Sequence, residues 1–330
     1  MASSPLWPPR GIRAEALLSS IMALLPDGTE IGAVHLRVAD LERQSAFYGE
    51  VLGLRMLGHD VGARPSDDAG AVGSIREGEA TGDPVTALGA RAQGPPLFVL
   101  RASPGATPAP RASTGLFHVA LLLPTRRALA ESIVRVRNAG WPFQGFADHA
   151  VSEAAYLADA EGNGLELYAD RPRSDWIRRG GEYHITTLPL DLDDLLSEAA
   201  GARGLGGGAG EAPAPPPHVD ARATVGHVHL RVGSLERAED FYVRRMGFEV
   251  TARGYPGALF VSAGGYHHHL GLNVWAGVGV PRPPASSLGL AAFEVVVPDA
   301  AARRRLLDGS DSGTLEDQDG NLVRVVGPSA

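Results

Sequence analysis

The 330-residue chain contains no cysteine and no lysine. Without cysteine it can form no disulfide, thiolate metal site or cysteine nucleophile, so any metal ion must be bound by histidine or carboxylate side chains. Without lysine, Schiff-base chemistry and a lysine general base are excluded, and all 30 basic residues are arginine. We therefore expect histidine and carboxylate groups to carry any metal or acid–base chemistry.

The sequence also lacks a long apolar run and a basic cluster. No segment approaches the roughly 18–20 consecutive apolar residues of a membrane span. The apolar segment 12–25 is interrupted by Glu15 and is followed by no small-residue cleavage pattern, so we interpret it as part of an N-terminal extension. The net charge of −8 argues against a nucleic-acid partner, because phosphate binding needs concentrated positive charge. We expect a cytoplasmic protein that acts on small molecules, with neither membrane nor nucleic acid as partner.

Two stretches of the chain repeat each other. Segments 33–54 and 227–248 align at an offset of 194 residues and are identical at 11 of 22 positions. Each begins with a Val-His-Leu-Arg-Val strand, passes through Leu-Glu-Arg into a helix that carries Phe-Tyr, and stops at a glycine. Weaker copies begin at Gly115 and Gly289, and their last strands follow Asp-x-x-Gly-Asn hairpin turns. The pattern predicts four β-α-β-β-β modules and an α+β fold.

The modules are separated by irregular segments. Residues 200–223 are rich in glycine and then in proline, which is typical of a linker. Residues 60–96 lie inside the first module and are interpreted as a surface insertion. The predicted organisation is an N-terminal extension (1–30), a first domain of modules 1 and 2 (31–172), a connector with the linker (173–223) and a second domain of modules 3 and 4 (224–330).

Strand periodicity predicts which side chains face a cavity. Because side chains alternate along a strand, His227 and His229 share a polar face, while Val228 and Leu230 pack under the helix. The same rule turns a further set inward: His118, Glu166, Tyr168, His267, His269, Asn273 and Trp275. It leaves His268 outside the inward set.

These features resemble a known superfamily. The paired modules, the first-strand histidine and the Gly-Asn-Gly-x-Glu run at 162–166 resemble the vicinal oxygen chelate superfamily, which includes glyoxalase I, extradiol dioxygenases and bleomycin-resistance proteins. Longer runs, among them TGLFHVALLLP, DHAVSEAAYLADAEGNGLELYADRPRSDW and AGGYHHHLGLNVWAG, are similar to the two-domain bacterial catechol 2,3-dioxygenase group. The resemblance covers roughly residues 31–175 and 224–327 and implies modules paired into two cupped, mixed β half-barrels.

The resemblance also implies a metal site. The superfamily's first-strand ligand position is held by His118 in module 2 and by His227 in module 3, whereas modules 1 and 4 have Ala33 and Ala292 there. The last-strand carboxylate of the motif corresponds to Glu166. Two histidines and one carboxylate form the arrangement that leaves open positions on non-haem Fe(II).

This ligand set, His118, Glu166 and His227, predicts that module 2 pairs with module 3 across the linker and module 1 with module 4. Fe(II) is the expected metal, with Mn(II) or another divalent ion as alternatives. In module 4, Arg324 takes the place of the last-strand carboxylate. An alternative pairing within the first half of the chain would use His35, His118 and Glu166.

Further residues follow from the extradiol resemblance. Members carry a histidine on the second strand and a tyrosine ten residues before the glutamate, which correspond here to His149 and Tyr156. For the catalytic histidine of the partner module, His269 is the first candidate and His267 the second. The expected substrate wall consists of His229, Asn273 and Trp275.

The resemblance implies ring cleavage of a small aromatic diol by O2. Related proteins often associate, so the resemblance is also compatible with a homo-oligomer. Two other classes of protein stay open. A glyoxalase-type isomerase or lyase would use a redox-inactive metal with His269 as a fourth ligand. A metal-free binding protein of the bleomycin-resistance type would have an apolar or acidic cavity and no metal.

Overall fold

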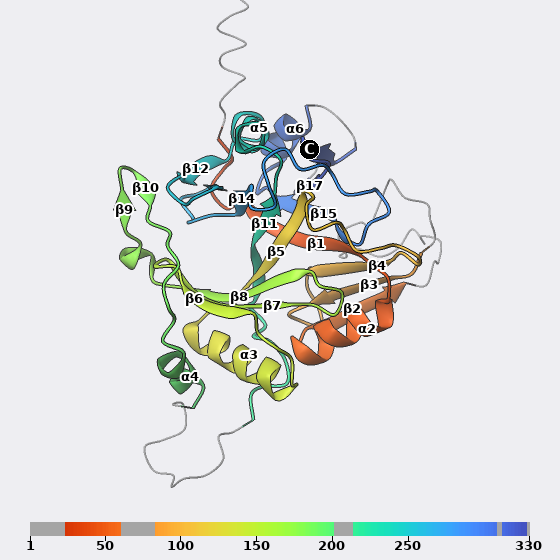
Figure 1. Ribbon diagram of the computed structural model, residues 1–330, viewed down its shortest axis with the longest axis vertical. Coiled ribbons are helices and arrows are strands. Elements are labelled where there is room, and N and C mark those ends of the chain that lie inside the picture. Colours follow the sequence, from red (N-terminus) through yellow and green to blue (C-terminus); the bar gives the residue numbers. More distant parts are fainter. Residues whose placement is uncertain (1–23, 61–82, 201–213, 309–311, 329–330) are drawn as a thin grey trace, which may run out of the picture.

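The computed structural model of the chain describes residues 24–60, 83–200, 214–308 and 312–328 (Figure 1). Most of the predicted N-terminal extension, the centre of the predicted insertion and the glycine-rich part of the predicted linker lie outside these residues. Among the described residues, no helix combines the length and the apolar composition that crossing a membrane requires.

Modules 1 to 3 have the predicted order of elements. Module 1 consists of β1 (Glu30–Val38), α2 (Leu41–Ala46), the π-helical η1 (Phe47–Val51), β2 (Arg55–Asp60), β3 (Val85–Gly89) and β4 (Phe98–Ala102). Module 2 consists of β5 (Gly115–Leu122), α3 (Arg126–Asn138), β6 (Gly145–Asp148), β7 (Ser152–Ala158) and β8 (Gly164–Asp170). Module 3 consists of β11 (Thr224–Arg231), α5 (Leu235–Glu239), the π-helical η3 (Asp240–Arg245), β12 (Glu249–Ala252), β13 (Ala258–Ser262) and β14 (Leu270–Asn273).

Module 4 is shorter than predicted. It consists of β15 (Gly289–Val296), α6 (Ala300–Leu307), β16 (Thr314–Glu316) and β17 (Leu322–Val326). Only six residues separate α6 from β16, which is too few for a further strand and its turns. Between modules 2 and 3, the connector forms η2 (Arg173–Asp175), the strand pair β9 (Arg178–Arg179) and β10 (Glu182–Tyr183), and α4 (Leu192–Ala200).

The repeated sequence explains the matching helices of modules 1 and 3. The side chains of Asp40 and Ser234 accept hydrogen bonds from the third residue of the following helix, so each caps its helix N-terminus. The Phe-Tyr pair then falls in the π-helical turn, where Tyr48 and Tyr242 are fully buried. Both tyrosines donate to buried aspartates of the hairpin turns, at 3.0 Å and 2.8 Å, which anchors each helix on the sheet below.

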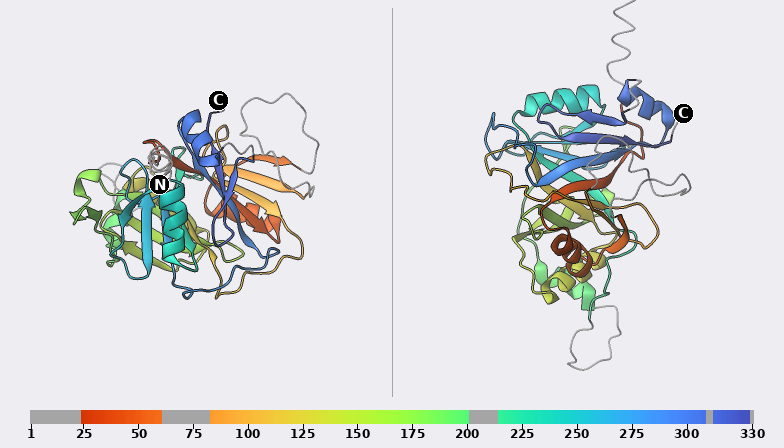
Figure 2. Two further views of the ribbon diagram at one scale, coloured as in Figure 1. Left: turned by 90° about the horizontal axis from the view of Figure 1, so that it is seen from above. Right: turned by 90° about the vertical axis from the view of Figure 1, so that its right-hand side faces the viewer.

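The strands form two large sheets, each of which combines one module from the first half of the chain with one from the second half. One has the order β16-β17-β15-β1-β4-β3-β2, and the other has the order β12-β13-β14-β11-β5-β8-β7-β6. Module 1 therefore pairs with module 4 and module 2 with module 3, as predicted. In Figure 2 (left) the two sheets lie side by side, with the blue and orange strands of modules 4 and 1 on the right. The curled sheets and the helices outside them confirm the α+β fold class.

The helices cover the outer face of each sheet. Figure 1 shows α2 and α3 on one side of the molecule, α5 and α6 on the other, and the first strands of the modules crossing between them. The aliphatic side chains of β5 and β11, among them Val119, Leu121, Val228 and Leu230, are buried in the main hydrophobic core. The opposite faces of these strands carry the histidines, as the periodicity predicts.

Candidate metal centre

Three buried side chains from adjacent strands meet on the inner face of the sheet of modules 2 and 3. The Oε2 atom of Glu166 lies 2.9 Å from His118 Nε2 and 3.1 Å from His227 Nε2, and the two Nε2 atoms are 3.3 Å apart. Among the described residues, this is the one group of histidine and carboxylate side chains close enough to hold a metal ion together.

Strand register explains why these residues meet. In β5, Ala120 is paired with Glu166 of β8 on one side and with His227 of β11 on the other. His118 lies two residues earlier in β5 and therefore on the same face. Since Ala120 is small, the three longer side chains converge over it. The sequence positions bring the predicted ligands together, and their role as ligands remains a prediction.

The electrostatics of the group suit a divalent cation. Burial alone would raise the pKa of Glu166, but the neighbouring His227 and His118 hold it well below its usual range. Burial lowers the pKa of His227 to about 4, despite the opposing effect of Glu166. An ionised Glu166 beside a neutral His227 matches the protonation states in which these groups bind a metal.

Behind His227, a tyrosine pair supports its ring. The ring of Tyr168 lies 4.9 Å from that of His227, and its hydroxyl is 2.7 Å from the hydroxyl of Tyr266. A Cβ atom added at Gly226 would lie 1.8 Å from the Tyr168 hydroxyl. Only glycine therefore fits directly before His227.

His149 and Tyr156, the predicted acid–base pair, do contact each other. His149 Nε2 is 2.6 Å from the Tyr156 hydroxyl, and its Nδ1 is 2.6 Å from the carbonyl of Thr186. Because Nδ1–H donates to that carbonyl, Nε2 of the neutral ring accepts from the tyrosine. The Tyr156 ring lies 5.7 Å from His118, and burial followed by the charge of Glu166 raises the pKa of Tyr156. The pair thus adjoins the candidate metal centre.

The predicted orientations of His268 and His269 are wrong, whereas His267 does lie beside His227, with ring centroids 6.4 Å apart. His269 Nδ1 accepts hydrogen bonds from the Ala263 amide (3.2 Å) and from the Ser262 hydroxyl (2.9 Å), and its ring lies on the side of Phe248. The excluded residue, His268, is instead the one whose ring lies 4.1 Å from His227. Strand β14 begins only at Leu270, so the alternation of side chains cannot be counted back through residues 267–269.

His267 supports His268 from behind. Its Nε2 is 2.8 Å from Asp170 Oδ1, and its Nδ1 is 2.7 Å from His268 Nδ1. In a neutral His267 that donates to Asp170, Nδ1 accepts from His268, which leaves Nε2 of His268 without a proton. Burial and the adjacent His227 and His267 lower the pKa of His268, so the ring stays neutral and able to accept a proton.

The remaining predicted residues form one wall beside the group. The ring of His229 lies 5.0 Å from His118 and 5.2 Å from Trp275, and burial lowers its pKa well below the usual range. Asn273 is fully buried, and its Oδ1 accepts from the backbone amide of Trp275. Asn273 therefore positions the chain that carries the tryptophan.

Sequence reasoning missed Phe117, which lies 5.1 Å from His229 and 5.2 Å from Trp275. Phe117 is 39% exposed and Trp275 is 43% exposed, so both present aromatic surface beside the buried histidines. Phe117 occupies the register shift between β5 and β11, where one extra residue turns it toward the site. A strand pattern alone contains no signal for such a shift.

The alternative ligand set is not brought together. His35 belongs to the other sheet, where its Nε2 is 3.0 Å from Glu294 Oε1. The second oxygen of Glu294 accepts from the Ala33 amide, and Arg324 is paired with Glu294 on the neighbouring strand. The equivalent place in the sheet of modules 1 and 4 thus holds a hydrogen-bonded histidine and glutamate instead of three converging ligands.

Two curled sheets of paired modules with a histidine–carboxylate group on one of them define a class of protein. Residues 30–167 and 224–323 match the model of the Glyoxalase/Bleomycin resistance protein/Dioxygenase superfamily, and the chain belongs to this superfamily. It is 40% identical over 281 residues to Catechol-2,3-dioxygenase of Bacillus subtilis (strain 168), across 84% of this chain and 86% of that protein.

Two solved structures show the same fold. A putative dioxygenase from Bacillus subtilis subsp. subtilis str. 168 is similar with a TM-score of 0.58 and 14% identity, over 92% of this chain and 87% of that one. Glyoxalase I from Zea mays is similar with a TM-score of 0.51 and 16% identity, over 91% and 93%. At these identities the similarity concerns the fold alone.

Proposed function

We propose that the chain is an Fe(II)-dependent extradiol dioxygenase that opens the ring of a catechol-type diol beside its two hydroxyl groups. The observation that carries the proposal is the buried group His118–Glu166–His227, in which burial lowers the pKa of His227 to about 4 and the adjacent histidines hold the pKa of Glu166 well below its usual range. The 40% identity to a catechol-2,3-dioxygenase supports the same activity. Both atoms of O2 enter the product, so the reaction needs no external reductant.

In this proposal the protein holds the metal and moves protons. Fe(II) bound by two imidazole nitrogens and one carboxylate would supply the positions at which diol and O2 meet and the electron transfer between them. His268, neutral and adjacent to His227, takes a hydroxyl proton from the diol. His267 and Asp170 fix the tautomer of His268 through their hydrogen bonds.

A second proton carrier lies on the opposite side of the group. Tyr156 donates to His149, and the two can donate a proton to one oxygen atom of O2 as the bond between its two oxygen atoms breaks, after which both atoms stay in the ring-opened product. The aromatic wall of Phe117, His229 and Trp275 offers ring faces against which a flat diol packs.

The two alternatives have less support. The isomerase alternative depends on His269 as a fourth ligand, but Ser262 and Ala263 hold this side chain away from the group. A metal-free binding protein has no use for a buried carboxylate between two histidines, because such a group is expensive to bury without a cation.

Metal analysis of anaerobically purified protein, followed by oxygen uptake with a panel of catechols and hydroquinones, tests the proposal. We expect about one iron per chain and oxygen consumption with at least one catechol, accompanied by a yellow ring-opened product. Protein that binds iron stoichiometrically yet consumes no oxygen with any diol would refute the dioxygenase proposal. Mn(II)-loaded protein that is more active than the iron form would revise the metal alone.

A further inference from the structure

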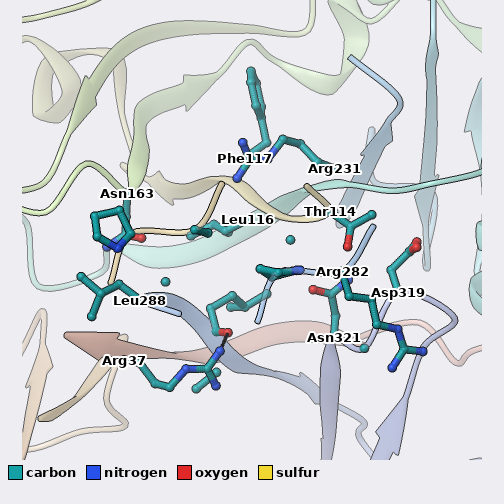
Figure 3. Close-up of a pocket in the computed structure, with 18 of the residues that line it drawn as sticks. Arg37, Thr114, Leu116, Phe117, Asn163, Arg231, Arg282, Leu288, Asp319 and Asn321 are labelled. Carbon is teal, nitrogen blue, oxygen red and sulfur yellow. Dashed lines mark hydrogen bonds between the residues drawn. The ribbon is translucent and has the colours of Figure 1, made fainter. Parts of the chain in front are cut away.

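A cavity lies where the two sheets meet. It has a volume of about 850 Å³ and is lined by residues from all four modules, but by none of the three candidate metal ligands (Figure 3). Many lining residues occupy equivalent positions in the repeats: Arg37 and Arg231, Gly115 and Gly289, Leu116 and Leu290, Asn163 and Asn321. The cavity is thus lined by equivalent residues of the repeated modules.

The two equivalent arginines differ in their hydrogen bonds. Arg37 donates to the carbonyls of Ser287 and Leu290, at 2.9 Å and 3.0 Å. Arg231 is paired with Gly115 just as Arg37 is paired with Gly289. Unlike Arg37, it makes no hydrogen bond and no ion pair with any described residue. Its Nε atom is buried, and burial without a compensating carboxylate lowers its pKa. A buried cationic donor with no partner is costly unless a ligand completes it.

A second unpartnered group lies beside Arg231. Thr114 lines the cavity, is 1% exposed, and its hydroxyl has no partner among the described residues. Thr114 directly precedes Gly115, which is paired with Arg231 across the two strands. Figure 3 labels both Arg231 and Thr114 among the side chains that line the cavity.

The acidic residues around the cavity are already engaged. Glu161 accepts from the backbone amides of Ala39 and Asp40. Asp319 accepts from the Gly233 amide, and Glu316 pairs with Arg282 at 2.7 Å. None of these carboxylates bonds to Arg231, so its positive charge stays available to a ligand.

We propose that this cavity binds a small oxyanion, a carboxylate or a phosphate, between the Arg231 guanidinium and the Thr114 hydroxyl. Guanidinium matches the fork of two oxygens in either anion, and the hydroxyl completes the coordination. A strand rises about 3.4 Å per residue, so four residues place Arg231 about 13 Å from His227 along β11. The anion therefore binds apart from the metal.

Thermal unfolding and titration calorimetry with defined anions test this site. The probes are sodium benzoate and acetate for carboxylates and sodium phosphate and sulfate for tetrahedral anions, each compared with chloride at equal ionic strength. The proteins are the metal-loaded wild type, Arg231→Met, Thr114→Val and Arg127→Gln. Arg127 is an exposed arginine of α3 that pairs with Glu131, and its variant is the charge-matched control.

We expect one anion class to raise the melting temperature of the wild type and of Arg127→Gln. Arg231→Met should lose this shift, with affinity weakened by about 10- to 100-fold, and should melt no lower than the wild type without anion because it removes an unpartnered buried charge. Thr114→Val should weaken the same anion less. Which class binds distinguishes a carboxylate ligand from a phosphate.

The proposal would be overturned if no probe bound the wild type, or if Arg231→Met retained the full anion-induced shift. Anion binding at the metal would survive Arg231→Met and so would be recognised. An Arg231→Met protein that melts well below the wild type in chloride would also contradict it, because a structural arginine behaves in that way.

Discussion

Replacing His227 by alanine should abolish metal binding, whereas replacing His35 should not. The two residues make a matched pair, since each is a buried first-strand histidine that lies about 3 Å from a glutamate oxygen. His227 shares its glutamate with a second histidine, and His35 does not. Only the first change therefore removes one of three converging donors.

The size of the effect can be worked out from the chain. A metal at 100 times its Kd stabilises the folded state by about 2.7 kcal/mol. With an unfolding entropy of about 2.1 cal/mol/K per residue, the 330-residue chain has about 0.7 kcal/mol/K, so saturation raises the melting temperature by about 4 °C. We expect this shift in the wild type and in His35→Ala, and no shift in His227→Ala.

The assay is anaerobic thermal unfolding with and without Fe(II), together with the metal content of the dialysed proteins. Metal-free melting temperatures are compared first, because His227→Ala leaves the buried Glu166 with one partner fewer, a loss worth about 1–3 kcal/mol. Loss of the shift in His35→Ala with retention in His227→Ala would refute the assignment and the strand-register argument behind it.

Three further outcomes are expected. Burial lowers the pKa of His269 to about 3, so as pH falls below 6.5 the unfolded chain takes up the proton first and the free energy of unfolding drops by about 1.4 kcal/mol per pH unit toward pH 3. In His269→Asn, the dependence of the free energy of unfolding on pH, measured with urea, should be smaller by about one proton. An unchanged pH dependence would contradict a buried, neutral His269. Gly226→Ala pushes on Tyr168 and should lower both the free energy of unfolding, by about 2–5 kcal/mol, and the metal content, whereas Gly145→Ala, with nothing near its Cβ, should change neither. Tyr156→Phe should keep its iron and its KM for a catechol but lose about 100-fold in kcat by oxygen uptake, and loss of iron instead would make the tyrosine structural.

The sequence predicts the site where regular strands carry it. His118, Glu166 and His227 all lie inside strands, so alternation fixes their face. The repeat shows which strands are first strands, and these pair across the linker in both sheets. Strand geometry gives the three side chains a common face, whereas their choice as ligands and the pairing of module 2 with module 3 are predicted from the resemblance to the superfamily.

The prediction fails where the strands stop. Gly264 and Gly265 both have positive φ, at 61° and 65°, so the chain turns before the histidine triplet and rejoins the sheet only at β14. Counting parity through such a turn inverts the faces, which is why His268 and His269 exchange their expected places. Phe117 was missed for a related reason, because its direction depends on a register shift between two strands distant in sequence.

The sheet of modules 1 and 4 shows how little of the site is due to the fold. It repeats the strand order and the first-strand pairing of the other sheet. At the positions of the two ligand histidines it has buried Ala33 and Ala292, and at that of Glu166 it has Arg324. A guanidinium in place of a carboxylate repels a cation, and the Glu294 carboxylate pairs with His35 instead of a metal. Since the same architecture holds a hydrogen-bonded histidine and glutamate on one side and three converging donors on the other, the functional assignment depends on those three side chains and not on the shared fold.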